Sequence, residues 1–123
     1  MRKIIFSLVV FLFSIITVAT KAQLLTWTPV FGQESSTPFT ITMDASKGNQ
    51  GLFFYTPVAD VYVHIAVITN LSTSSADWKY NKFTWATTPA AAAAASLGGN
   101  KWSYTITGGL RTFFGITNAS ESI

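Results

Sequence analysis

The sequence of 123 residues contains no cysteine and a single histidine. Without cysteine there can be no disulfide, no thiol nucleophile and no thiolate metal site, so the fold depends on its apolar core. One histidine is too few for the usual structural zinc sites. The Gly-x-Ser-x-Gly elbow that carries the nucleophile of many hydrolases is also absent. The sequence therefore predicts a protein that is not an enzyme.

Charged residues are scarce as well, at 11% of the chain, and the net charge of +3 depends on where they lie. Three of the cations, Arg2, Lys3 and Lys21, fall within the first 21 residues. From residue 23 onward, five basic residues are matched by five acidic ones. A neutral surface is unsuited to tracking phosphates, so we expect no nucleic-acid partner.

The N-terminus has the three parts of a secretory signal peptide. A basic start precedes an apolar stretch over residues 4–19, and a small-x-small sequence ends at Ala22. This stretch is shorter than the roughly 20 residues of a membrane span. We therefore expect cleavage after Ala22 and a domain of residues 23–123 that is secreted or held at the cell surface or in the periplasm, with no membrane segment left.

The remaining residues are rich in Thr, Ser and aromatic side chains, and turn signals separate short runs of β-branched residues. This pattern is typical of an all-β domain. We expect an immunoglobulin-like antiparallel β-sandwich of about six to seven strands. About six strands are visible, and Ile123 looks like the start of another. The sequence thus predicts a module that is incomplete at its C-terminus, with its last strand missing.

Several segments give specific predictions. Residues 25–29 and 39–44 are expected strands, the second with strict period-two alternation. Residues 60–70 carry the strongest apolar pattern, so we place them centrally in a sheet. Residues 78–85 are expected to be extended, with a bulge or turn at Asn81. Residues 94–107 predict a hairpin, 110–115 a short helical turn or loop, and 89–95 either a helical turn or an edge strand.

His64 is the one side chain suited to acid–base chemistry near neutral pH. Its apolar neighbours favour a structural role or contact with a ligand, and a hydrolase built on His64 is a remote alternative. Asp44 and Asn49, in and after the second strand, are weak candidates for a calcium site. Apart from that possibility we expect no cofactor.

Residues 78–85, with the sequence WKYNKFTW, interleave aromatic rings with polar side chains. Sugars present C–H faces to flat rings and hydroxyls to polar groups, so a carbohydrate platform needs this combination. The alternative is that the rings belong to the core. We expect at least one exposed ring here, because a long polar loop precedes Trp78.

Three stretches, residues 41–52, 60–85 and 96–116, resemble N-terminal modules of secreted Bacteroidetes proteins that carry α-amylase-family catalytic domains. The runs Ile65-Ala66-Val67-Ile68-Thr69-Asn70 and Trp78-Lys79-Tyr80 carry most of the resemblance. The strand with His64 and the loop with Trp78 are more loosely similar to starch-binding modules of carbohydrate-binding families twenty-five and twenty-six.

The resemblance implies a non-catalytic module that binds α-glucan for a downstream α-amylase-type domain. It places His64, Trp78 and Trp85 in the sugar platform, with Lys79 and Tyr80 as flanking polar contacts. The alternative is a structural spacer or interaction domain of an extracellular multidomain protein, which binds no sugar and buries both tryptophans.

Overall fold

Residues 23–123 are described by the computed structural model, and they form an all-β fold with very little helix. Four strands make one antiparallel sheet in the order β1-β2-β4-β3, with β1 at Leu25–Thr28, β2 at Phe39–Asp44, β3 at Ala95–Gly98 and β4 at Lys101–Ile106. The predicted all-β class is confirmed. The predicted signal peptide and its cleavage site after Ala22 lie outside the described residues.

The centre of the sheet is the pairing of β2 with β4, which runs over six residues of each strand from Phe39↔Ile106 to Asp44↔Lys101. Apolar side chains alternate on both strands, so the register gathers them on one face of the sheet. These are Phe39, Ile41, Met43, Trp102, Tyr104 and Ile106. The strand predicted at residues 39–44 is confirmed at both ends, and β1 confirms the strand predicted at residues 25–29 apart from its final proline.

The predicted hairpin is β3 and β4, joined at Gly99 and Asn100. Both turn residues have positive φ, 56° and 62°, as the favoured two-residue hairpin turns require. Within residues 23–123, helical structure is limited to the 3₁₀ turn η1, Ala90–Ala92, and the single turn α2, Leu110–Phe114. Of the alternatives for residues 89–95, the helical turn is therefore observed at Ala90–Ala92, and β3 begins at Ala95.

The expectation of a central strand at residues 60–70 is wrong. This segment makes only isolated bridges, Tyr62 with Ala93 and Val67 with Lys79. Its backbone bonds two separate segments, residues 92–94 and residues 79–82, and the positive φ of Tyr80 and Ala86 keeps these segments from forming one continuous ladder with it. The irregularity expected at Asn81 is thus found one residue earlier, at Tyr80, and residues 78–85 include no strand.

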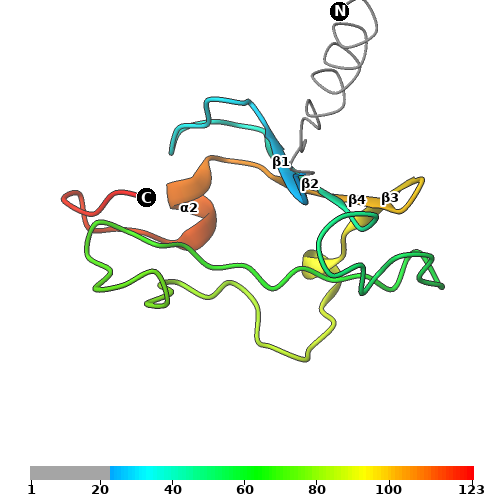
Figure 1. The fold of residues 1–123 in the computed structure, drawn as a ribbon. Helices are drawn as coiled ribbons and strands as arrows, with labels where there is room; N and C mark the ends of the chain where they lie inside the picture. Colours follow the sequence, from blue (N-terminus) through cyan, green and yellow to red (C-terminus); the bar gives the residue numbers. More distant parts are fainter. Residues whose placement is uncertain (1–22) are drawn as a thin grey trace, which may run out of the picture.

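The apolar face predicted for residues 60–70 does pack against the sheet. Val61 is buried with Ala45, Ala94 and Trp102, and Val67 with Ile106, Phe114 and Ile116. Val63 and Ile65 lie against the same two clusters. Figure 1 shows this green segment running beneath the sheet, with the C-terminus, in red, beside it.

The molecule therefore has two layers, of which one is a sheet and the other irregular extended chain. The finer prediction of an immunoglobulin-like sandwich with six or seven strands stays a prediction, since the described residues contain four strands in one sheet. We call residues 52–92 the facing layer, and they carry the residues considered next.

Candidate functional site: an aromatic cluster on the facing layer

His64 lies between Trp78 and Trp85. Its ring centroid is 4.9 Å from that of Trp85, in an edge-to-face arrangement at 81°, and 6.2 Å from that of Trp78, at 31°. Both distances are typical of interacting aromatic pairs. The structure thus brings together three of the five predicted site residues, and we call these three rings the aromatic cluster.

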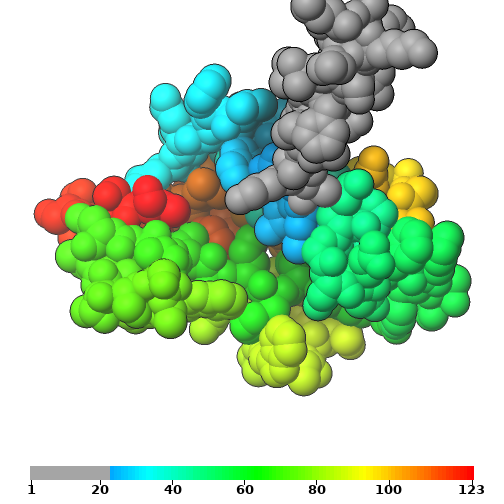
Figure 2. Space-filling view, viewed as in Figure 1, coloured from blue at the N-terminus to red at the C-terminus, as the bar shows by residue number. Residues whose placement is uncertain are grey.

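Both indole rings of the cluster are open to solvent. Trp78 is 53% exposed and Trp85 74%. In contrast, Trp102 is 3% exposed and donates its indole N–H to the carbonyl oxygen of Val58 at 2.8 Å. The prediction of at least one exposed ring in residues 78–85 is confirmed. Figure 2 shows the yellow-green chain after residue 80 standing out from the rest of the surface.

Local backbone bonding explains how these rings meet. Val67 and Lys79 exchange backbone hydrogen bonds of 3.0 and 2.8 Å, and Lys82 N–H donates to the Ile65 carbonyl oxygen at 3.0 Å. These bonds hold the Trp78 segment alongside the His64 segment. Trp85 then lies in a tight turn, in which Thr87 donates both its N–H and its hydroxyl to the carbonyl oxygen of Thr84.

A pocket of about 280 Å³ opens beside Trp85. It is lined by Tyr62, Val63, His64, Thr84, Trp85, Ala86 and Thr87. Its lining combines aromatic residues with three that carry hydroxyls, Tyr62, Thr84 and Thr87. This mixture of apolar walls and a few polar groups is the usual character of a small-molecule site.

The imidazole of His64 is half-buried, and its Nδ1 is buried without a hydrogen-bond partner among the described residues. In a Ser-His-Asp triad, a carboxylate accepts a hydrogen bond from this nitrogen. The geometry gives the hydrolase alternative no support. His64 makes an edge-to-face contact with Trp85 and forms part of the pocket lining.

Lys79 and Tyr80, the predicted flanking contacts, have partners of their own. The Lys79 Nζ lies 3.1 Å from Asp77 Oδ2, and the Tyr80 hydroxyl donates to Glu121 Oε2 at 2.6 Å. This bond to an anion is the main cause of a raised pKa for Tyr80. Direct contact of these two side chains with a sugar stays a prediction.

The two calcium candidates, Asp44 and Asn49, each accept hydrogen bonds within a separate turn. Asp44 Oδ1 accepts bonds from the N–H and hydroxyl of Ser46, and Asn49 Oδ1 accepts one from the N–H of Gly51 at 3.2 Å. The Lys101 ammonium lies 3.7 Å from Asp44 Oδ2, where it competes with a bound cation. Within residues 23–123, no group of three or more His, Asp or Glu side chains is arranged to hold a metal ion.

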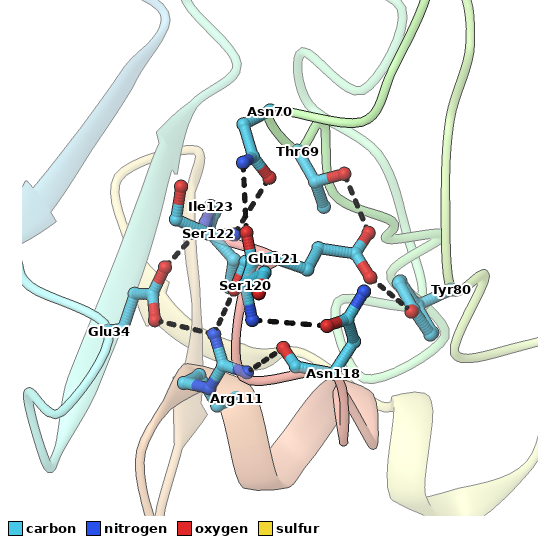
Figure 3. A network of polar contacts seen from close by, with 10 residues as sticks. All are labelled: Glu34, Thr69, Asn70, Tyr80, Arg111, Asn118, Ser120, Glu121, Ser122 and Ile123. Atoms are coloured by element: carbon cyan, nitrogen blue, oxygen red, sulfur yellow. Dashed lines mark hydrogen bonds and ion pairs between the residues drawn. The ribbon is translucent and has the colours of Figure 1, made fainter.

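The sequence did not reveal the polar network around Glu121 (Figure 3). Glu121 is 4% exposed, and its two carboxylate oxygens accept bonds from the hydroxyls of Thr69 and Tyr80 at 2.7 and 2.6 Å. Arg111 bonds Glu34 Oε2 at 3.0 Å and the carbonyl oxygen of Asn118 at 2.7 Å. Because these partners are far apart in the sequence, no local pattern points to them.

None of the helices found in residues 23–123 has the length and apolar character needed to cross a membrane. Comparisons of the chain with models of protein families, with curated proteins and with solved structures find no match.

Proposed function

We propose that residues 23–123 form a non-catalytic carbohydrate-binding module whose ligand is an α-glucan such as starch or a maltooligosaccharide. In this proposal the module is exported by its N-terminal signal and serves a polysaccharide-degrading protein, secreted or at the cell surface, with an α-amylase-type catalytic domain downstream. Trp78 and Trp85 stack on glucose rings, and His64 bonds a sugar hydroxyl.

The observation that carries this proposal is the exposure of two tryptophans around a histidine. Burying an indole normally stabilises a domain, so two large rings left in solvent, 53% and 74% exposed, indicate a surface that meets a partner. Hydroxyls lie in the adjoining pocket. The neutral charge balance of residues 23–123 suits an uncharged ligand.

The inclination of the rings favours a curved sugar chain over a flat one. The plane of His64 is tilted by 31° to Trp78 and by 81° to Trp85, so the two indole planes differ by at least 50°, the difference between these angles. A flat glucan surface needs coplanar rings. An α-linked glucan turns from one residue to the next and can place successive faces on inclined rings.

Affinity per site is expected to be low. Two stacked rings and a few hydrogen bonds must offset the loss of ligand freedom, which leaves a Kd of roughly 0.1–1 mM. Several modules or an attached enzyme on the same polysaccharide would raise the overall affinity.

Affinity electrophoresis in amylopectin tests the proposal. We expect retardation of the wild-type protein and a loss of binding of about tenfold or more in Trp78→Ala and in Trp85→Ala. Trp27→Ala is the matched control, because Trp27 is also exposed, at 45%, but lies on β1 in the sheet. An unretarded wild-type protein contradicts the proposal, as does an equal loss of binding in the control.

The spacer alternative predicts that both tryptophans are buried, and this part of it is wrong, because Trp78 and Trp85 are 53% and 74% exposed. The alternative also requires that neither ring meets sugar. Acrylamide quenching of tryptophan fluorescence, with and without maltoheptaose, separates the two functions. Protection of Trp78 and Trp85 by the sugar supports the binding module, whereas unchanged quenching at millimolar sugar supports the spacer.

A further inference from the structure

The Glu121 carboxylate joins two segments of the facing layer, and it is distant in sequence from both. One oxygen accepts the hydroxyl of Thr69, which lies two residues after the bridge residue Val67 on the His64 segment. The other accepts the Tyr80 hydroxyl, two residues after Trp78. Figure 3 shows the carboxylate between these two hydroxyls. Glu121 thus spans the two segments whose alignment brings His64 and Trp78 together.

The Tyr80 end of this link is under backbone strain. Tyr80 has φ of 53°, in the left-handed region that non-glycine residues rarely adopt. Backbone bonds of Lys79 and Lys82 fix the chain on either side of Tyr80, and the hydroxyl bond of 2.6 Å to a nearly buried carboxylate fixes the Tyr80 side chain. If that bond is lost, the backbone can relax, and Trp78 moves with it.

The position of Glu121 itself is fixed from the other side. Arg111 bonds the carbonyl oxygens of Glu121 and Asn118, and Asn70 exchanges hydrogen bonds with Ser122. The C-terminal segment is therefore anchored to α2 and to the turn after Thr69 without using the Glu121 carboxylate. The Glu121 carboxylate is therefore held at a fixed position, from which it accepts the Tyr80 hydroxyl.

We propose that Glu121 is a positioning residue for the aromatic cluster: through Tyr80 and Thr69 it holds Trp78 in the orientation that binds α-glucan, and protonation of Glu121 releases it. This inference rests on the proposed function and adds to it an acid-sensitive control of the same site.

The groups around Glu121 explain why its network of hydrogen bonds is lost only at acid pH. The bonds from Tyr80 and Thr69, helped by the positive charges of Lys79 and Arg111, hold the pKa of Glu121 below its usual value of 4.5, against the opposing effect of desolvation. Because the pKa is lowered in the folded protein, the ionised network is complete at neutral pH. It is lost only as the pH falls through the folded-state pKa.

The test measures maltoheptaose affinity by calorimetry for the wild type, Glu121→Gln and Tyr80→Phe. We expect both variants to bind about fivefold more weakly at neutral pH, a change equivalent to one net hydrogen bond. Wild-type affinity should fall as the pH is lowered below 4.5, the usual value that the folded-state pKa lies under, and Glu121→Gln should show a smaller fall over the same range.

The chain offers a matched control in a second tyrosine–carboxylate pair, in which the Tyr55 hydroxyl lies 3.4 Å from Asp60 Oδ2. Tyr55→Phe and Asp60→Asn should bind as the wild type does and keep its pH profile. Thermal melts confirm that each variant is folded at the temperature of the titration. If Glu121→Gln does not fold, Tyr80→Phe decides the question. Wild-type affinity in folded Tyr80→Phe, or in folded Glu121→Gln, overturns the inference.

A wild-type protein that binds no glucan contradicts the proposed function. The effect of Glu121 and Tyr80 on the position of Trp78 can still be measured in that case. The emission of Trp78, isolated by subtracting the spectrum of Trp78→Phe, should become more accessible to acrylamide in Tyr80→Phe. An unchanged quenching constant for Trp78 would show that Glu121 and Tyr80 do not position it.

Discussion

The sheet and the facing layer are built by different means. In the sheet, β2 and β4 pair directly over six residues each, and Thr40 and Thr105 add a hydroxyl–hydroxyl bond of 2.9 Å across the ladder. In the facing layer, segments meet at isolated bridges. Elsewhere its residues bond through side chains, such as Thr69 and Tyr80 to Glu121.

Under the proposed function, this difference separates the residues that stabilise the domain from those that bind its ligand. The regular ladder fixes a continuous apolar face, and the irregular chain covers that face with Val61, Val63, Ile65 and Val67. The opposite side of the same chain is then free to carry His64 and the two exposed tryptophans. Recognition residues commonly sit on irregular chain that a regular scaffold positions.

The largest expected effect comes from breaking the contact between the layers. Ile106 of β4 is 1% exposed and packs with Val67, Phe114 and Ile116. Ile106→Ala should lower the free energy of unfolding by about 3 kcal/mol, because it leaves a cavity between sheet and facing layer. Urea denaturation measures this loss.

Ile68→Ala is the counterpart on the outer side of the facing layer, where Ile68 is 41% exposed. We expect it to change stability by less than about 1 kcal/mol. Similar losses in the two variants would contradict the division into a packed inner side and an open outer side.

A smaller effect is expected at the turn that joins the hairpin to the facing layer. Asn100 has φ of 62°, and its side-chain oxygen accepts the Phe54 N–H at 2.7 Å. Asn100→Ala should destabilise by about 2 kcal/mol, roughly half from the left-handed backbone and half from the lost bond.

Asn100→Gly loses the same bond but tolerates the same φ, so it should destabilise by only about 1 kcal/mol. Chemical denaturation of the two variants side by side separates the backbone contribution from the bond to the facing layer. Equal losses would show that backbone strain at this turn is negligible.

The sheet was predictable because its signals are local. Alternation over residues 39–44 and 101–107 requires only the pleat of a strand, and Gly99-Asn100 favours the turn that the structure contains. Residues 60–70 have an equally clear pattern, yet they form no ladder. A ladder depends on a partner with a continuous extended path, and the positive φ at Tyr80 and Ala86 interrupts that path.

The candidate site was predictable in part for the same reason. The interleaving of aromatic and polar residues predicted an exposed ring within residues 78–85, whereas the grouping of His64 with Trp78 and Trp85 came only from the resemblance described in the sequence analysis. The part played by Glu121 was not predicted, because its partner Tyr80 lies 41 residues away in the sequence. Long-range pairs of this kind are fixed by the whole fold and leave no spacing in the sequence.

The smallest expected effect tests a polar link between the layers. Lys82, in the facing layer, donates from Nζ to the Phe113 carbonyl oxygen at 2.6 Å and lies 4.8 Å from the centre of the Phe113 ring in α2. Lys82 is exposed, so Lys82→Met should destabilise by only about 0.5–1 kcal/mol. Lys82→Arg, which keeps the charge over the ring, should lose less.

Urea denaturation of these two variants at low and high salt gives the measurement, and the difference between them should shrink as salt screens the exposed charge. A loss above about 2 kcal/mol in Lys82→Met would mean that polar links, rather than the apolar clusters around Trp102 and Ile106, hold the facing layer on the sheet. A small loss would mean that the apolar clusters hold the facing layer on the sheet. Side chains on the exposed side of this layer could then be substituted with little loss of stability.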